Sequence, residues 1–252
     1  MSPWWRRIEP LIPLPSALEA LGDEGVMSRY TDEVLLDRVA GSAARFEDFD
    51  ADFKPLRRTD RMAEVRRRFE AGTYPPPLDL VQLGDLYFVL DGHHRVAAAR
   101  ERGWTTLPAR VRRVCTVAFA RCCLRVADLP TKTAERRFLE RVPLPDDVRE
   151  HLRLDRPADW ARLGDAALAW GYRRERVDGP PYCCAHDLAA AWWAEEVLPA
   201  VRRSRRQAQA EGNAERVADL TDVQVFVTAL AERDGLGRLD WDDPSNGELT
   251  CC

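Results

Sequence analysis

The chain of 252 residues is long enough for one large domain or two small ones with a buried core. Its 45% hydrophobic and 32% charged residues exclude a disordered or fibrous protein. The net charge of −4 and the pI near 5.7 exclude a global positive field that would hold the chain on nucleic acid. Arginine outnumbers lysine 36 to 2, a bias that we attribute to genome composition.

The sequence shows no sign of membrane insertion or export. No apolar run approaches the roughly 20 residues that span a bilayer, and residues 1–8 lead into no apolar segment with a cleavage site. We therefore expect a cytoplasmic protein with no membrane partner. Zinc sites usually separate paired cysteines by two to four residues, so we predict no metal site from the adjacent pairs. These pairs are Cys122–Cys123, Cys183–Cys184 and Cys251–Cys252.

In chain order, residues 1–30 are rich in proline and tryptophan. We predict an irregular N-terminal arm there, with one short helix at 17–21 and with Trp4 and Trp5 packing it. The compact apolar segment 33–39 predicts a first strand. In residues 45–53 acids alternate with phenylalanines without a helical period, which predicts a loop anchored by aromatic rings.

The next segments carry clear boundary signals. Thr59 can cap a helix that Gly72 ends. Gly84-Asp85 is a two-residue hairpin signal between two apolar runs. We therefore predict a helix, a hairpin, an alanine-rich helix and a last strand, at residues 59–71, 78–83 with 86–90, 96–102 and 107–111.

The remainder carries apolar residues at helical spacing. We predict helices at 133–141, 158–174, 186–206 and 220–233. The expected fold class is α+β, a small mixed sheet with helices followed by a mainly α-helical domain. The expected domains are the arm (1–30), the α/β domain (31–114), the helical domain (115–234) and a loose acidic tail (235–252).

The loop Asp91-Gly92-His93-His94-Arg95 joins the second hairpin strand to the alanine-rich helix. Gly92 lets an anion approach the backbone closely, and the first amides of a helix point outward at its positive end. His93 and His94 can donate from their rings, and Arg95 offers a planar fork that matches phosphate oxygens. Asp91 can orient a histidine or hold a metal-bound water. Together these features predict an anion site.

A purely structural interpretation carries about equal weight on spacing alone. In that interpretation Asp91-Gly92 is a simple turn, and the two histidines cap the helix and bond to neighbouring strands.

The stretch from Pro77 to Val111 resembles the ParB/sulfiredoxin superfamily. Members of this superfamily place Asp-Gly-x-His-Arg between a strand that is recognisable from its sequence and an alanine-rich helix. The resemblance covers roughly residues 33–113 and implies a ParB/sulfiredoxin-like sheet. The segment 38–50 and the helical tail also resemble bacterial proteins that join this domain to a helical region.

Within the superfamily, sulfiredoxins carry Gly-Cys-His-Arg, and His93 stands at the cysteine position here, which argues against sulfinic acid reduction. ParB partition proteins bind CTP through a similar loop and read DNA through a helix-turn-helix, which we do not find after residue 113. Free-serine kinases carry Asp-Gly-x-His-Arg, closest to this loop. That resemblance implies that Gly92, His93, His94 and Arg95 hold nucleotide phosphates.

A kinase also needs an acid that positions or deprotonates the acceptor hydroxyl. The resemblance places it after the first strand, where Glu47, Asp48 and Asp50 lie. Asp48 is our first choice because it stands between two phenylalanines, although all three acids fit a solvated loop equally well. Our candidate catalytic residues are Asp48 and His93, and Arg45 is a candidate second phosphate ligand.

The leading hypothesis is binding of a nucleotide (ATP, ADP or CTP with Mg²⁺) or another phosphate ester, with phosphotransfer to a small hydroxyl substrate as its enzymatic form. The alternative is a non-enzymatic ParB-like module that acts on DNA or a protein partner, with DNA less favoured because of the acidic pI. Nuclease activity would need an acid cluster that the sequence does not assemble. The sequence leaves turnover and oligomeric state open.

Overall fold

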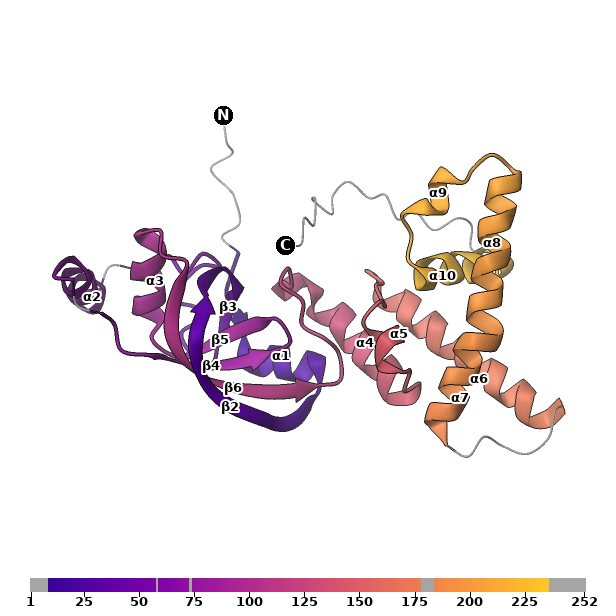
Figure 1. Cartoon of the computed structure of the whole chain (residues 1–252), viewed down its shortest axis with the longest axis horizontal. Coiled ribbons are helices and arrows are strands. Elements are labelled where there is room, and N and C mark those ends of the chain that lie inside the picture. Colours follow the sequence, from indigo (N-terminus) through magenta and orange to yellow (C-terminus); the bar gives the residue numbers. More distant parts are fainter. Residues whose placement is uncertain (1–8, 58, 73, 178–183, 236–252) are drawn as a thin grey trace. The chain divides into compact units, whose positions relative to one another are not determined.

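The computed structural model describes residues 9–57, 59–72, 74–177 and 184–235 (Figure 1). They divide into two compact units that meet in sequence at Leu129 and Pro130. The division comes later than the expected boundary after residue 114. Residues 117–124 stay with the first unit because Ala118, Ala120 and Leu124 are buried in its core.

The first unit is built on a six-stranded mixed sheet in the order β1-β3-β5-β4-β6-β2. The pairs β1/β3, β3/β5 and β4/β6 are parallel, and β4/β5 and β2/β6 are antiparallel. A mixed sheet followed by a helical region confirms the predicted α+β class. In chain order the strands are Ile12–Pro13, Asp23–Leu35, Val39–Ser42, Leu78–Leu83, Leu86–Asp91 and Thr106–Thr116.

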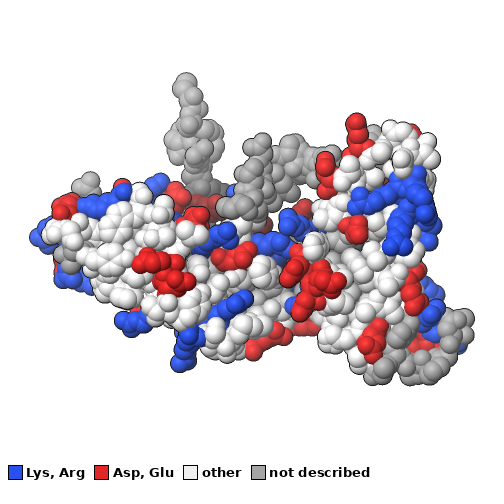
Figure 2. Space-filling view, in the orientation of Figure 1, with Lys and Arg blue, Asp and Glu red and all other residues white. Residues whose placement is uncertain are grey.

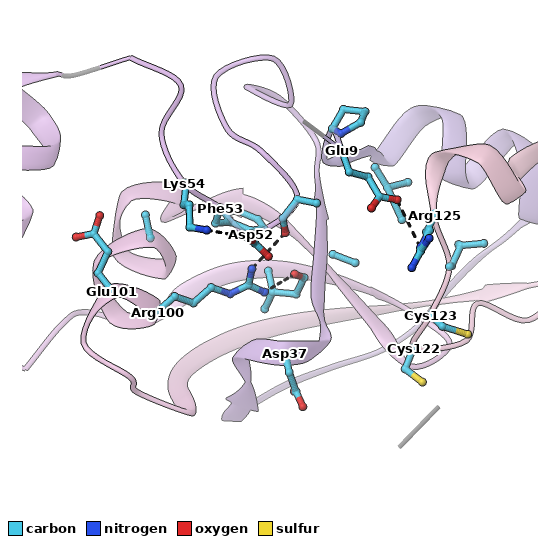
Figure 3. A pocket seen from close by; sticks show the side chains of 17 residues that line it. Glu9, Asp37, Asp52, Phe53, Lys54, Arg100, Glu101, Cys122, Cys123 and Arg125 are labelled. Carbon is cyan, nitrogen blue, oxygen red and sulfur yellow. Dashed lines mark hydrogen bonds and ion pairs between the residues drawn. The ribbon is translucent and has the colours of Figure 1, made fainter. Parts of the chain in front are cut away.

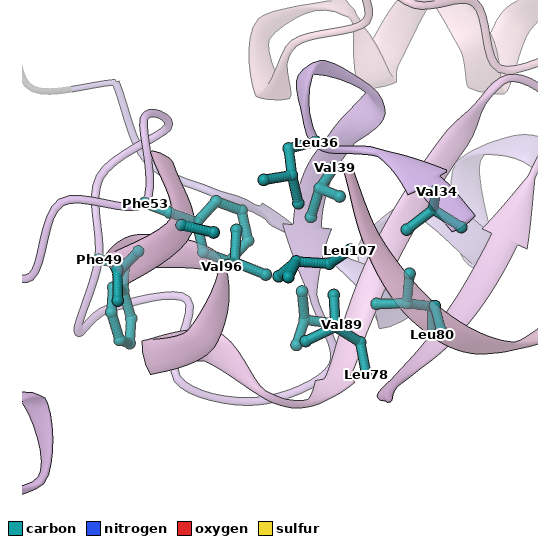
Figure 4. Close-up of a cluster of buried hydrophobic side chains, with 14 of the residues drawn as sticks. Val34, Leu36, Val39, Phe49, Phe53, Leu78, Leu80, Val89, Val96 and Leu107 are labelled. Atoms are coloured by element: carbon teal, nitrogen blue, oxygen red, sulfur yellow. The ribbon is translucent and has the colours of Figure 1, made fainter. Parts of the chain in front are cut away.

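Both faces of the central strands are buried. Leu78 and Leu80 of β4 belong to the hydrophobic cluster that also contains α2 (Asp60–Glu70) and α3 (His93–Glu101), shown in Figure 4. Val81 and Leu83 of the same strand belong to the cluster with α1 (Leu14–Leu21). A strand covered on both faces has a nearly continuous apolar sequence, as Leu78–Leu83 has.

The hairpin, the helix and the aromatic loop of the sequence analysis are confirmed. β4 and β5 pair antiparallel across Gly84-Asp85. The Thr59 side chain caps α2 by accepting a hydrogen bond from the Met62 amide. Phe49 and Phe53 are buried anchors of the loop at 45–53.

Within the predicted arm of residues 1–30, the short helix expected at 17–21 is confirmed as part of α1, but the irregular structure expected after it is wrong. Residues 23–35 form β2, which pairs with β6 as an edge strand. β2 is exposed along most of its length, so its sequence has no buried face to mark it as a strand. The single strand expected at 33–39 is also wrong, because a 3₁₀ turn at Leu36–Arg38 separates β2 from β3. Trp4 and Trp5 lie outside the described residues.

The second unit is helical, and each of its four predicted helices is present. Its centre is an aromatic cluster in which Trp192 contacts Phe138 and Phe226, with ring centroids 6.5 and 6.0 Å apart. None of the helices in the described ranges combines the length and apolar character that a bilayer crossing requires. The expected tail lies outside the described residues from 236 onward. The helices are α4 (Leu129–Arg141), α5 (Asp146–Arg149), α6 (Pro157–Val177), α7 (Ala185–Trp192), α8 (Leu198–Ala210), α9 (Glu215–Ala218) and α10 (Asp222–Arg233).

Candidate functional site

Gly92 forms the turn between β5 and α3. Its φ of 112° lies in the left-handed region, and a Cβ there would come within 2.4 Å of Leu78 Cδ2, so only glycine fits. The Gly92 carbonyl accepts hydrogen bonds from the amides of Arg95 and Val96 at 2.8 and 3.0 Å. The amides of His93 and His94 precede these bonds and have no intrahelical acceptor. The turn therefore presents two main-chain donors at the positive end of α3.

The His93 side chain points into the protein. It is 6% exposed, stacks on Phe49 at a centroid distance of 5.8 Å, and places Nε2 2.6 Å from Ser42 Oγ. Burial, followed by the charge of Arg45, lowers the pKa of His93 to about 4. This placement differs from the catalytic role expected for the ring, because a neutral, buried imidazole does not face a ligand. Only the main-chain amide of His93 lies at the turn.

Arg95 is also committed to internal bonds. Its Nη1 donates to the carbonyls of Pro76 and Pro77 at 2.6 and 2.7 Å, and its Nη2 donates to Asp91 Oδ2. The side chain is only 14% exposed, whereas that of Asp91 is 72% exposed. The structure therefore differs from the open phosphate fork expected of Arg95. Asp91 orients this guanidinium rather than a histidine.

His94 is the half-buried side chain of the turn. Its Nε2 accepts a hydrogen bond from Arg45 Nη1 at 3.5 Å, and its ring packs on Phe49 at 5.3 Å. Burial lowers the pKa of His94, and the charges of Arg45 and Arg61 lower it further, against an opposing effect of Asp48. Its Nδ1 is buried with no hydrogen-bond partner in the described part of the chain. Arg45 and one unsatisfied donor thus lie together at the start of α3.

The three candidate acids have different surroundings. Asp50 Oδ1 accepts from the Lys54 amide at 2.7 Å and so stabilises a local turn. Glu47 lines an apolar cavity of about 260 Å³ with Phe46 and Phe49. Asp48 is exposed and is the acid whose charge acts on His94. Asp48 is thus the one of the three whose charge affects the pKa of His94.

Sequence reasoning did not identify Arg61 or Ser42 as site residues. Arg61 lies in the first turn of α2, is paired with Glu64 at 3.3 Å, and its charge contributes to the lowered pKa of His94. Ser42 ends β3 and meets His93 from 51 positions away in the chain. No local sequence pattern predicts the position of either residue at the site, because both positions depend on how β3, α2 and α3 pack.

A cavity of about 610 Å³ lies elsewhere in the first unit (Figure 3). Its Arg100 donates to the carbonyls of Leu36 and Val39 at 2.5 and 2.8 Å and lies over the Phe53 ring. Figure 3 also shows the Lys54–Asp52 pair, with a separation of 3.0 Å. No residue of the 91–95 turn lines this cavity, so it is separate from the predicted site.

Within the described ranges no three His, Cys, Asp or Glu side chains are grouped to hold a metal.

Residues 53–125 match the family model of the ParB N-terminal domain. Two solved structures are similar to parts of this chain. Sulfiredoxin from Arabidopsis thaliana is 15% identical, with 34% of this chain and 88% of that chain covered and a TM-score of 0.28. A Pnob8-like ParB-N domain is 11% identical, with 79% and 88% covered and a TM-score of 0.25. No curated protein matches the sequence.

Residues 53–125 of the first unit are therefore similar to the ParB N-terminal domain, in agreement with the ParB part of the resemblance that the loop carries. The family match includes the 91–95 turn and α3. It begins after Glu47, Asp48 and Asp50, so it carries no information on the candidate acids.

Proposed function

We propose that the first unit binds a nucleotide or another phosphate ester, with a phosphate group at the turn Gly92–His94. The observation that carries the proposal is the contact of Arg45 with His94 at the N-terminus of α3, where Arg45 Nη1 lies 3.5 Å from His94 Nε2. Helix N-termini with nearby arginines favour phosphate because main-chain donors, helix dipole and guanidinium charge act on the same oxygens.

Each residue has a distinct role in this proposal. The amides of His93 and His94 donate to the phosphate, and Arg45, which is exposed beside them, supplies charge. A small rotation of the His94 ring lets its unsatisfied Nδ1 donate to a phosphate oxygen. Arg95 and the His93 ring shape the turn from inside without contacting the ligand. Mg²⁺ would arrive with the phosphates of ATP, ADP or CTP.

Titration calorimetry with ATP, ADP and CTP, each with and without Mg²⁺, tests the binding step. Arg45 has a φ of 58°, so Arg45→Asn removes the charge while keeping a residue that tolerates this backbone. We expect about tenfold weaker binding, the loss of one charge-assisted contact. Arg113→Asn, at an exposed position on β6, is the matched control and should bind normally. No heat of binding with any of the three nucleotides contradicts the proposal.

Phosphotransfer is the enzymatic form of the same proposal. The γ-phosphoryl group of ATP would pass to the oxygen of a small alcohol, ADP would leave, and Asp48 would take the hydroxyl proton. Asp48→Asn should then abolish ADP release that depends on the alcohol while leaving ATP binding intact. Equal ADP release by the variant removes Asp48 from the reaction.

A second candidate is a non-enzymatic ParB-like module that acts on DNA. It is favoured by the exposed residues Arg202, Arg203 and Arg206 on α8, and Figure 2 shows basic side chains gathered over this helix. A gel shift with duplex DNA that weakens with salt and with Arg202→Glu/Arg203→Glu, but not with Arg45→Asn, supports this function. A shift lost only with Arg45→Asn assigns DNA to the first unit instead.

A further inference from the structure

The sheet of the first unit has two edges of different kinds. β1 is only two residues long, Ile12–Pro13, and its shortness and its proline protect that edge from a further strand. β2 forms the other edge and runs for 13 residues, Asp23–Leu35. Figure 1 shows β2 on the outer side of β6. The sheet is therefore open to extension at β2.

The regular part of β2 is the segment 28–35. It pairs with β6 in unbroken register, from Ser28 opposite Arg113 to Leu35 opposite Thr106, and the irregular pairing lies before Ser28. Within the described part of the chain no other strand pairs with β2. Alternate residues of the segment therefore direct their amide and carbonyl groups away from β6. These groups form a template for another strand.

Exposed apolar side chains lie at both ends of this segment. Val26 and Met27 are 51% and 60% exposed at one end, and Leu35 is 48% exposed at the other. When two identical strands pair antiparallel, each end of one strand meets the opposite end of its copy. The apolar ends of two copies of β2 would therefore cover each other and leave water.

The charges of the segment lack opposite charges within the same chain. Arg29 lies directly opposite Arg112 of β6, and like charges in this position destabilise a sheet. Glu33 lies opposite Pro108 and accepts a hydrogen bond from the Tyr74 hydroxyl at 2.8 Å. Neither Arg29 nor Glu33 forms an ion pair with a residue in the described ranges. A partner strand can supply the missing charges.

Two-fold symmetry restricts how two copies of β2 can pair. Residues that lie opposite each other point to the same face of the sheet, so in a symmetric antiparallel pair one residue lies opposite its own copy. When that residue is Thr31, Arg29 lies opposite Glu33 of the second copy, and Glu33 lies opposite Arg29. Leu35 then lies at the level of the exposed apolar segment 26–27 of the second copy.

The neighbouring symmetric registers lack this complementarity. A pair centred on Arg29 or on Asp32 places like charges opposite each other. A pair centred on Tyr30 places Glu33 opposite the apolar Met27 and leaves Arg29 without an acid. Among the registers centred on residues 29–32, the one centred on Thr31 alone pairs opposite charges.

We infer that the open edge of β2 binds a second copy of this chain, in an antiparallel strand pair centred on Thr31. Charged residues on an edge strand often prevent such pairing, but Arg29 and Glu33 have opposite signs at positions that meet. The segment 28–35 buries less than the roughly 1,200 Å² of a stable interface, so we expect a dissociation constant of about 10 to 100 µM. This inference does not depend on nucleotide binding by the first unit.

Sedimentation velocity of the full chain tests the association. Between about 5 and 500 µM, a range that brackets the expected dissociation constant, the average sedimentation coefficient should rise from that of a monomer to that of a dimer. A chain that stays monomeric over the whole range overturns the proposal.

Charge variants of the full chain test the register. Arg29→Glu and Glu33→Arg each create two pairs of like charges in the dimer, so each variant alone should associate about tenfold more weakly or worse. An equal mixture of the two variants restores opposite charges at both positions and should associate like the wild type. Arg67→Glu, exposed on α2, makes the same change of net charge as Arg29→Glu and is the matched control.

The three substituted side chains are exposed, and circular dichroism checks that the variants fold. A dimer that Arg29→Glu weakens no more than Arg67→Glu does overturns the proposal. A mixture of Arg29→Glu and Glu33→Arg that associates no better than either variant alone overturns it as well, because the two positions then do not meet.

Discussion

The Nε2 atom of His93 lies 2.6 Å from the hydroxyl oxygen of Ser42, and this contact joins the start of α3 to the end of β3. The Ser42 hydroxyl donates to the Ala44 carbonyl and accepts from the Ala44 amide. The hydroxyl and the ring nitrogen can each donate or accept in this contact, so it ties the buried ring to β3 in either neutral tautomer. Burial favours the neutral form of His93, because the charged ring would lose its hydration there.

The lowered pKa of the buried His93 ring predicts that the stability of the protein depends on pH. Because the pKa of His93 falls from 6.5 to about 4 on folding, the unfolded chain binds the proton more readily. The stabilising effect is complete above pH 6.5 and is lost as the pH falls from 6.5 towards 4, by up to about 3 kcal/mol in the free energy of unfolding. Urea unfolding of the wild type between pH 8 and 4 measures it.

His93→Gln is the matched variant, since the glutamine amide keeps a donor for Ser42 but does not titrate. The difference in free energy of unfolding between the two proteins should narrow as the pH falls through this range. A difference that stays constant with pH shows that His93 keeps an ordinary pKa in the folded protein.

Arg95 predicts a stability effect at a residue expected to bind ligand. Arg95→Ala leaves the carbonyls of Pro76 and Pro77 without their donor, which should lower the free energy of unfolding by about 2 to 3 kcal/mol. Asp91→Ala removes only the exposed partner and should cost under about 1 kcal/mol. Urea denaturation compares them, and equal losses would mean that the ion pair, not the carbonyl bonds, matters.

The parts of the fold that the sequence predicts are specified by residues close to them in the chain. Gly84-Asp85 specifies the hairpin turn, and Thr59 marks the start of α2 through its own cap. Gly92 marks the strand-to-helix turn because no other residue adopts its backbone beside Leu78. Each of these signals lies within a few residues of the structure it determines.

The parts that the sequence does not predict depend on distant segments. β2 is a strand because β6, about 80 positions later, pairs with it, and not because of a buried face of its own. The histidine pair looks alike in sequence, yet Ser42 and Phe49 hold the His93 ring inside while Arg45 meets His94 at the surface. Which ring faces a ligand is therefore a property of packing.

Gly92→Ala tests the geometry of the turn. The added Cβ meets Leu78 Cδ2 at 2.4 Å, and the φ of 112° is strained for any residue with a side chain. We expect a loss of roughly 2 to 4 kcal/mol in the free energy of unfolding. In the Leu78→Ala background the loss from Gly92→Ala should shrink, because the clash is gone while the strain persists. If the losses in the free energy of unfolding from the two substitutions simply add in the double variant, the clash with Leu78 is not the cause.

Substitutions of Gly41 and Gly25 by alanine distinguish the cost of a steric clash from the cost of backbone strain. A Cβ on Gly41 would lie 2.3 Å from the Ile12 carbonyl oxygen and 2.4 Å from Phe88 Cδ1, whereas Gly25 has a φ of 98° and nothing within 4 Å. Gly41→Ala should therefore displace β1 from β3 and lower the free energy of unfolding by about 3 kcal/mol or more. Gly25→Ala should cost about 1 kcal/mol through strain alone.

Gly41→Ala should also change the pKa of His93. Ser42 follows Gly41 in β3, so a shift of this strand lengthens the hydroxyl contact with Nε2 and admits water to the imidazole. The pKa of His93 should then rise from about 4 towards 6.5, which a histidine-selective NMR titration measures directly. Gly25→Ala, on the distant edge strand β2, should leave that titration unchanged. A His93 pKa that stays near 4 in Gly41→Ala would show that burial against Phe49, without the register of β3, is enough to keep the ring neutral.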